Sequence, residues 1–469
     1  MRAVVIGGGL AGAAAALDLA SRELEVTLVS AGAGATALSW GSLDIAVPSP
    51  DGWGLPLRDA TASRFLSPRE RLAACLRTRP RHPYATLFGR IGGGAAESAA
   101  ADAAKSAAAT LDSWLAPSGL RVEGSLDHAR LLANVRGALR ASDYAFTGPA
   151  EGDLQGAVEV EVAAIPGLAL HDARPLARAL AAEFAAIGLP RPAFRVVPLP
   201  LPARFVVDGG APARVAARTD SEEGLRTLLG AVAARHGREA PARRADSERR
   251  LLLLPPILGF TRLQSKLAQL REAAGCRVAE CLGAPPVSPA GLRLVGALAS
   301  ALSRAGVVVE RARVRGFERA GKRLLAVRVQ APEDSSSTQR RVEGDAVLLA
   351  SGRFLGGGIV ESEGGIHEAL FDLPLYDESG VRGDGSKASR LVRATPEGPQ
   401  RLFSCGVRTD SRLRPLGSDG EPAFENLFVA GDLMGGFDSS TERTGLGVAL
   451  LTGLRAASEM ARLAEEEGA

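Results

Sequence analysis

The first thirty residues alternate between apolar and small side chains in the pattern that opens a βαβ unit. The run Arg2–Ile6 predicts a buried strand, and Leu10–Ser21 predicts a helix with small residues on its packing face. Glu25–Val29 predicts a second strand. Because two short apolar strands separated by one helix are typical of parallel sheets, we expect the chain to begin with a Rossmann-like domain.

The same pattern returns in the last third of the chain. Ser288-Pro289 predicts the start of a helix that Gly306 ends. Two further apolar runs, Ala346–Ala350 and Leu427–Ala430, predict buried strands, and Thr444–Leu463 predicts the last helix. The segment between Gly306 and Ala346 contains three alternating runs, which predict an antiparallel meander. These runs are Val307–Glu310, Val314–Glu318 and Leu324–Val329.

The middle of the chain has a different pattern, with helices predicted at Pro68–Arg77 and Asp172–Ile187 and a strand at Leu251–Leu254. The proline-rich segment Pro190–Pro202 predicts a connection without a strand. We therefore expect an α/β fold in which a Rossmann-like domain carries an inserted mixed α/β cap domain. The expected division is residues 1–50 and 286–469 for the Rossmann-like domain and residues 51–285 for the cap.

Composition and charge exclude several classes of protein. The 469 residues are 46% hydrophobic and 23% charged, and the formal net charge is only +3. The charges are interspersed and form no basic stripe, which argues against a nucleic-acid partner. No apolar run reaches the ~20 residues that span a bilayer. We expect a cytoplasmic chain whose membrane contact, if any, is indirect.

The cysteines predict neither a metal site nor an iron–sulfur cluster. No pair has the C-x-x-C spacing of either kind of site. Scattered thiols in a long chain are typical of a reducing compartment. The four cysteines are Cys75, Cys276, Cys281 and Cys405.

The turn after the first predicted strand carries the G-x-G-x-x-G fingerprint of dinucleotide-binding folds. Gly7 permits the tight turn, Gly9 lets the backbone approach a pyrophosphate, and Gly12 lets the helix pack close to the strand. The free N–H groups and the dipole of the helix then attract phosphate charge. The predicted cofactor-binding residues here are Gly7, Gly8, Gly9, Leu10, Ala11 and Gly12.

The end of the second strand lacks one expected element. An acidic residue usually binds the ribose hydroxyls at this point, but Val29 is followed by Ser30. A hydroxyl binds a ribose less strongly than a carboxylate does. The adenosine half of a dinucleotide is thus left open, and the cofactor is predicted as one flavin, either FMN or FAD.

A second group of residues, far along the chain, completes the predicted flavin site. The strand before Gly431 and Asp432 would return beside the first strand, so that Gly431 allows a close approach and Asp432 binds a ribityl hydroxyl. The last helix begins near Gly445 and Gly447, where its dipole would stabilise negative charge on a reduced flavin ring. The other predicted contributors are Ser351 and Gly352 after a third strand, and Ser39, Gly41 and Ser42 in a loop that would pass the flavin.

These motifs together resemble one known family, that of the B subunit of anaerobic glycerol-3-phosphate dehydrogenase. The similarity covers both ends of the chain well and is loose between about residues 90 and 280. The matching segments are Gly7–Gly12, Gly41-Ser42-Leu43-Asp44, His82-Pro83-Tyr84, Leu349–Val360, Gly406–Pro415 and Glu425–Asp438.

The resemblance implies an FAD/NAD(P)-binding fold and a flavin, for which FMN is the usual assignment. It also implies a complex with a larger catalytic flavoprotein, the A subunit, and an iron–sulfur protein, the C subunit. Through these partner subunits, this chain would be peripheral on the inner face of the cell membrane. The implied reaction converts sn-glycerol 3-phosphate and quinone to dihydroxyacetone phosphate and quinol, with the quinone reached indirectly. The absence of cysteine clusters in the sequence agrees with electrons leaving through another polypeptide.

The catalytic residues stay unassigned at the level of the sequence. His82 and His367 are possible general bases, and Arg140 and Arg443 are candidate binders of the substrate phosphate. Three hypotheses remain open: this chain oxidises glycerol 3-phosphate itself, it is a flavin relay or assembly subunit, or it is another flavin-dependent reductase of the same fold.

Overall fold

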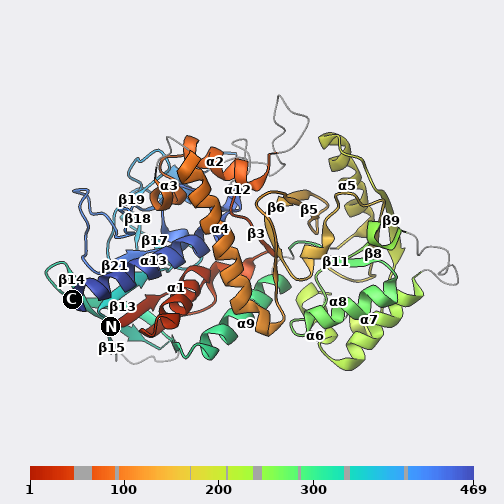
Figure 1. The fold of residues 1–469 in the computed structure, drawn as a ribbon, viewed down its shortest axis with the longest axis horizontal. Helices are drawn as coiled ribbons and strands as arrows, with labels where there is room; N and C mark the ends of the chain where they lie inside the picture. Colours follow the sequence, from red (N-terminus) through yellow and green to blue (C-terminus); the bar gives the residue numbers. More distant parts are fainter. Residues whose placement is uncertain are drawn as a thin grey trace. The chain divides into compact units, whose positions relative to one another are not determined.

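The computed structural model describes residues 1–46, 66–89, 94–169, 171–206, 210–235, 246–283, 287–331, 339–395 and 400–468. The chain divides into two compact units (Figure 1). The first unit comprises Met1–Thr36, Asp44–Thr110 and Leu298–Ala469, and the second comprises Ala37–Leu43 and Leu111–Ala297. The helices α4 (Gly94–Leu115) and α9 (Pro289–Arg304) each contribute residues to both.

The first unit is built on a five-stranded sheet in which every neighbouring pair of strands is parallel. The two predicted strands of the βαβ opening and the runs Ala346–Ala350 and Leu427–Ala430 all contribute to this sheet. It is therefore the Rossmann-like core expected from the sequence. In spatial order its strands are β12 (Val308–Arg311), β2 (Glu25–Ser30), β1 (Arg2–Ile6), β16 (Ala346–Leu349) and β21 (Leu427–Val429).

Two helices from opposite ends of the chain pack against each other in the first unit. They are α1 (Leu10–Ser21) and α13 (Gly445–Gly468), which lie side by side in Figure 1 in red and blue. The small residues Ala13–Ala16 of α1 are completely buried. A side chain at Gly453 of α13 would clash with the Ala11 carbonyl. Small residues on both helices therefore allow the close approach.

One of the three runs expected in the meander was assigned wrongly. The run predicted at Val307–Glu310 forms β12, which pairs in parallel with β2 at the edge of the main sheet, with Val308 opposite Thr27. An edge strand alternates like a meander strand, so periodicity alone does not separate the two. The remaining meander is antiparallel, as expected: β13 (Arg313–Ala320), β14 (Arg323–Gln330) and β15 (Arg340–Glu343).

Residues that the sequence placed at the start of the cap belong to the first unit. The helices α2 (Pro68–Thr78) and α3 (Pro83–Phe88) lie within its segment Asp44–Thr110. Tyr84 is completely buried, and its hydroxyl lies where a side chain on Gly447 of α13 would reach. The observed boundaries therefore differ from the expected ones, because this packing joins the helical segment to the first unit.

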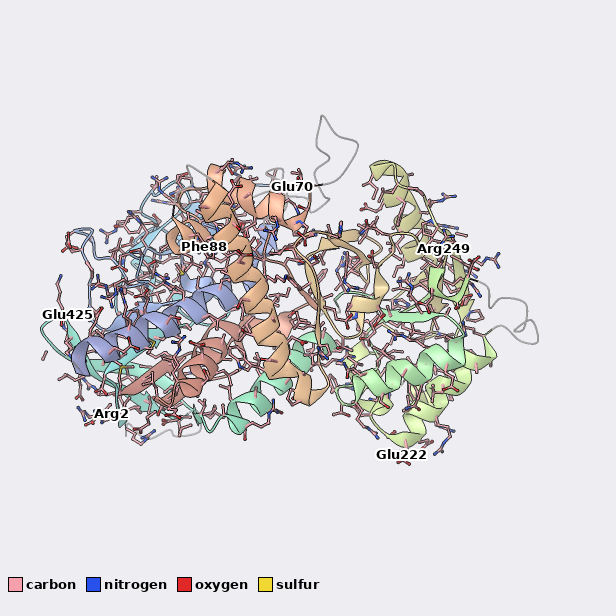
Figure 2. All side chains as sticks on the ribbon, in the orientation of Figure 1. Arg2, Glu70, Phe88, Glu222, Arg249 and Glu425 are labelled. Atoms are coloured by element: carbon pink, nitrogen blue, oxygen red, sulfur yellow. The ribbon has the colours of Figure 1, made fainter. Side chains whose placement is uncertain are left out.

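Serine at the start of α2 is expected to stabilise the first unit by about 1 kcal/mol. The Ser67 hydroxyl accepts from the Glu70 N–H, and the Glu70 carboxylate accepts from the Ser67 N–H, which completes a capping box (Figure 2 labels Glu70). We expect Ser67→Ala to lower the free energy of unfolding by this amount in urea titrations. Ser67→Thr keeps the hydroxyl and is the control, and equal stability of all three proteins would contradict the prediction.

The second unit has its own parallel sheet, in the order β11 (Arg277–Glu280), β10 (Arg250–Leu254), β8 (Glu159–Ala164) and β9 (Ala193–Pro198). The segment predicted as a strandless proline-rich connection contains β9. Its prolines are tolerated because β9 is an edge strand that places Pro198 at its end. The helices of this unit are α5 (Ala173–Ile187), α6 (Pro212–Thr219), α7 (Glu222–Ala234) and α8 (Leu263–Ala274).

Buried ion pairs fix the core of the second unit. Arg293 and Glu280 are both almost fully buried, and the nearest nitrogen and oxygen lie 2.5 Å apart. Lys266 is likewise buried and pairs with Asp220 at 2.5 Å. Each charge has its partner, as buried charges require. The short strands of this unit are β3 (Ser42–Leu43), β4 (Val122–Gly124), β5 (Arg130–Ala133), β6 (Leu139–Ser142) and β7 (Tyr144–Phe146).

The remaining elements of the first unit form hairpins and short helices around the carboxyl edge of its sheet. Within the described ranges, no helix combines the length and hydrophobicity that crossing a bilayer requires. Side chains that could together ligate a metal ion are not grouped anywhere in those ranges. The remaining elements are β17 (Ile359–Ser362), β18 (Gly365–Glu368), β19 (Leu375–Tyr376), β20 (Gly406–Val407), α10 (Ala388–Leu391), α11 (Arg401–Ser404) and α12 (Ser439–Glu442).

Candidate functional site

The register of the main sheet brings distant segments to one edge. Ile6 lies opposite both Val29 and Leu349, and Leu349 lies opposite Val429. Because the strands are parallel, the residues that follow them emerge together at the carboxyl edge. The glycine turn, Ser30, Ser351-Gly352 and Gly431-Asp432 all begin within two residues of these strand ends.

Two glycines of the fingerprint are required by the protein itself. Gly7 has a φ of +118°, and a side chain there would clash with the Ala350 carbonyl at the end of β16. A side chain at Gly12 would clash with the Gly7 carbonyl. Gly7 also donates its N–H to the Val29 carbonyl at 2.9 Å. The turn is therefore fixed between β2, β16 and the first turn of α1.

Gly9 differs because the protein does not require a glycine at this position. Its φ is −74°, which any residue can adopt, and an added Cβ would meet only the Thr36 hydroxyl, at 3.3 Å. No side chain caps α1, whose Leu10 N–H donates to Thr36 Oγ1 at 2.9 Å. The N-terminus of α1 thus has room for a ligand next to it, as a phosphate group needs.

Ser30 lies against the glycine turn, as the sequence predicted for the end of β2. A side chain on Gly8 would clash with the Ser30 hydroxyl. That hydroxyl donates to the Gly32 carbonyl at 2.7 Å and accepts from the Gly32 N–H at 3.2 Å. The Ser30 hydroxyl already donates its proton within this turn. Toward a ribose hydroxyl, Ser30 could therefore only accept a hydrogen bond.

The end of β21 approaches the same turn from the other side. Gly431 has a φ of +76°, and a side chain there would lie 2.8 Å from the Ala11 Cβ. Its N–H donates to Thr452 Oγ1 of α13 at 2.8 Å. The next residue, Asp432, has a buried Oδ1 without a hydrogen-bond partner among the described residues. A buried carboxylate oxygen in this state needs a donor from a ligand or from water.

Two more buried side-chain oxygens near this edge also have no hydrogen-bond partner within the described ranges. Ser351 Oγ, two residues after β16, is buried and without a partner. Thr444, directly before α13, is fully buried, and its Oγ1 likewise has no partner. Each such group costs about 1–3 kcal/mol when it stays unsatisfied. These two oxygens and Asp432 Oδ1, which we call the three open acceptors, therefore point to a missing polar ligand.

The start of α13 is shaped by backbone contacts. A side chain at Gly447 would lie 2.5 Å from the Asp44 carbonyl oxygen, so glycine lets that segment cross the helix closely. Before the helix, Arg443 adopts a φ of +62°, which reverses the chain between α12 and α13. Gly445 is the first residue of the helix. Arg443 is thus part of a strained turn, and its predicted binding of a substrate phosphate stays a prediction.

Four of the predicted binding residues lie in the second unit. Ser39 Oγ accepts from the Gly41 N–H at 3.4 Å, and Gly41 has a φ of +103°. Ser42 pairs with Ala145 between β3 and β7. Arg140 lies on β6, opposite Leu132 of β5. Their predicted roles toward a flavin or a substrate stay predictions.

His82 has structural partners on both sides of its ring. It is completely buried and caps α3, because its Nδ1 accepts from the Tyr84 N–H at 3.1 Å. Its Nε2 lies 3.2 Å from Glu442 Oε2. Arg79 Nη2 lies 2.6 Å from Glu442 Oε1. These contacts hold His82 in a buried structural cluster, although Nε2 and Glu442 Oε2 are not aligned as a hydrogen bond. The ring is completely buried against these neighbours, which argues against a role as general base.

Burial and mutual contacts together set the charges of His82, Arg79 and Glu442. Burial would raise the pKa of Glu442, but His82 and Arg79 outweigh it and lower that pKa to about 2. Burial lowers the pKa of His82, whereas Cys75 and Glu442 raise it to about 9. A protonated Nδ1 could not accept the Tyr84 N–H, however. The contact at Nδ1 thus favours a neutral ring with its proton on Nε2, which faces Glu442 Oε2 at 3.2 Å.

Two further polar side chains have structural contacts. His367 lies in the β17–β18 hairpin, where its Nδ1 is 3.3 Å from the Gly365 carbonyl. Arg353 is buried and donates to the carbonyls of Met434 at 2.7 Å and Phe437 at 2.9 Å. Arg353 thus joins the loop after β16, which contains Ser351, to the segment after β21, which contains Asp432.

A parallel Rossmann-like sheet, a glycine turn at its carboxyl edge and open acceptors beside that turn define the nucleotide-binding fold of a flavoenzyme. The chain belongs to the FAD binding domain family, whose model matches residues 2–448. Membership of this family supports a flavin cofactor.

Relatives of the chain are named as B subunits of anaerobic glycerol-3-phosphate dehydrogenase. The chain is 29% identical over 466 residues to the B subunit of the anaerobic glycerol-3-phosphate dehydrogenase of Yersinia enterocolitica, with 97% of each chain covered. A Halobacterium salinarum protein named as a probable B subunit of the same enzyme is 30% identical over 224 residues, 48% of this chain and 49% of its own. The family resemblance seen in the sequence is thereby confirmed.

Similarity to solved structures is more distant. A 3-ketosteroid delta1-dehydrogenase from Sterolibacterium denitrificans matches 98% of this chain and 99% of its own, with a TM-score of 0.40 and 12% identity.

Proposed function

We propose that this chain binds one flavin and serves as the B subunit of a quinone-linked anaerobic glycerol-3-phosphate dehydrogenase. The observation that carries the proposal is the set of three open acceptors beside a glycine turn whose Gly9 leaves room for a ligand. The name shared by the relatives supports the choice of substrate.

The residues present fit a flavin at this edge of the sheet. The N-terminus of α1 would hold the phosphate of the cofactor through N–H groups and the helix dipole. Asp432 would accept from a ribityl hydroxyl, which satisfies its open Oδ1. Thr444 and the N-terminus of α13 would face the pyrimidine end of the ring, where negative charge develops on reduction.

When bound, the flavin would supply the redox chemistry, and in the direct version of the proposal it would accept a hydride from carbon 2 of glycerol 3-phosphate. In the direct version of the proposal, this chain would also need a base for the substrate hydroxyl proton. His82 is held by Tyr84 and Glu442 and does not serve. This observation favours a relay role, in which substrate oxidation takes place on a partner protein.

The relay role requires partners. We propose a catalytic flavoprotein, the A subunit of the complex, and an iron–sulfur protein, its C subunit. Together they would deliver electrons to a quinone and keep this chain at the inner face of the cell membrane. The word "subunit" in the names of the relatives supports an assembly of this kind.

Anaerobic addition of sn-glycerol 3-phosphate to the flavin-loaded protein tests the two versions. In the relay version, the visible flavin absorbance of the isolated chain stays unchanged, whereas that of the complex with the catalytic and iron–sulfur partners bleaches. Bleaching of the isolated chain at a catalytically useful rate would establish direct oxidation. A flavin that stays oxidised in both preparations but is reduced by another donor would favour an unrelated flavin-dependent reductase.

Asp432→Asn is expected to weaken flavin binding about tenfold, because a charged acceptor is replaced by a neutral one. The affinity is measured by titrating the apoprotein with flavin and following the quenching of flavin fluorescence. Asp419→Asn, at an exposed loop position of the same unit, is the control and should bind like the unaltered protein. Equal affinities for both variants would remove Asp432 from the site.

A further inference from the structure

The turn between α12 and α13 is held by a buried contact that the proposed function has not used. Glu442, the last residue of α12, accepts the Asp438 N–H at 2.8 Å with its Oε1. Its other oxygen, Oε2, lies 3.2 Å from His82 Nε2, and Arg79 binds Oε1 at 2.6 Å. The carboxylate thus joins α12 to the segment that precedes α3.

Glu442 lies two residues before Thr444, whose Oγ1 is one of the three open acceptors. Between them, Arg443 takes the left-handed conformation that reverses the chain. On the far side of the turn, α3 reaches the first turn of α13, where a side chain on Gly447 would lie 2.8 Å from the Tyr84 hydroxyl oxygen. His82 contributes to both sides, because it caps α3 and contacts Glu442.

We propose that the contact between His82 and Glu442 positions the N-terminus of α13 against the flavin and so sets how readily the flavin is reduced. This inference rests on the proposed flavin site. The dipole at the N-terminus of a 24-residue helix stabilises negative charge only within its first turn, so a small displacement of that turn matters. His82 and Glu442 are positioning residues, since they act through Thr444 and the first N–H groups of α13.

The test compares flavin-loaded variants by two measurements on the bound flavin. His82→Asn keeps a side chain that caps α3 well but is too short to reach Glu442. We expect this variant to retain flavin, to show a lower midpoint potential, and to bind sulfite about fivefold more weakly, which corresponds to the loss of one helix-terminus interaction. Sulfite binding reports on stabilisation of negative charge in the ring and needs no substrate.

His171→Asn is the matched control, because His171 is also buried but belongs to the second unit. It should leave both measurements unchanged. Unchanged potential and sulfite affinity in a flavin-loaded His82→Asn protein would overturn the inference and leave the proposed function standing. Unaltered protein that takes up no flavin would instead refute the proposed function.

A second variant distinguishes position from charge and decides the question if His82→Asn does not fold. Glu442→Gln keeps the size of the side chain and removes its negative charge. If the carboxylate acts by positioning α13, the potential falls as in His82→Asn. If the potential rises, the carboxylate acts through its charge on the flavin, and the positioning role is wrong.

Discussion

Gly9→Val is expected to give a folded protein that has lost its flavin. Valine can adopt the φ of −74° at this position, and the single close contact of its Cβ is with the Thr36 hydroxyl, at 3.3 Å, which a small shift of Thr36 would relieve. Its branched methyl groups would occupy the space next to the N-terminus of α1, where the phosphate of the cofactor would bind. We expect flavin affinity to fall more than about hundredfold, roughly 3 kcal/mol, as for an overpacked site.

The flavin content of the purified protein, from its visible absorbance, measures this effect. Gly230→Val on α7 of the second unit is the control, because an added side chain there meets open space. Both variants should unfold cooperatively in urea at similar concentrations. A Gly9→Val protein with a full complement of flavin would place the cofactor elsewhere.

Glu442 is expected to make stability depend on pH below about pH 4.5. Its pKa is lowered from the ordinary value of 4.5 to about 2 in the folded protein, because His82 and Arg79 stabilise the charged form. A lowered pKa stabilises the fold fully above the unfolded value, and this stabilisation is lost as the pH falls through the folded value. The expected contribution at neutral pH is about 3 kcal/mol.

Urea unfolding of the unaltered protein and of Glu442→Gln, at about pH 6 and about pH 3, measures this contribution. The difference in unfolding free energy between the two proteins should be largest at the higher pH and shrink by more than half at the lower one. A difference that is the same at both pH values would show that Glu442 does not carry the acid sensitivity.

The glycine turn and the strands around it could be predicted from the sequence because their signals are local. Gly12 is required by its contact with the Gly7 carbonyl within one βαβ unit, and Gly7 by its φ of +118° in the same turn, both of which follow from the strand–turn–helix pattern. The clash that a side chain on Gly7 would make with the distant Ala350 carbonyl does not. The sequence also placed the strand before Gly431 directly beside the first strand, which is wrong: β16 lies between them and pairs with β1 on one side and with β21 on the other. The end of β21 still reaches the glycine turn, because neighbouring parallel strands end at the same edge of a sheet.

Residues whose role depends on distant contacts could not be predicted. Thr36, which accepts from the Leu10 N–H, and Thr452, which accepts from the Gly431 N–H, lie outside every motif. The ion pair between Arg79 and Glu442 joins segments that share no periodicity. Thr444 carried a weak signal, because it is the first residue of the predicted last helix, a position where threonine often caps.

The wrong strand assignments have a similar origin. β12 and β9 are both edge strands, which bury one side only and tolerate polar residues and proline. An edge strand therefore looks like a meander strand or a loop in the sequence. Its true partner is decided by the sheet to which the chain returns, which periodicity does not encode.

The cofactor of the purified protein tests the central claim most directly. We predict that the protein is yellow, that heat releases one flavin per chain, and that chromatography identifies it as FMN or FAD. A colourless protein that takes up neither compound from solution would contradict the account.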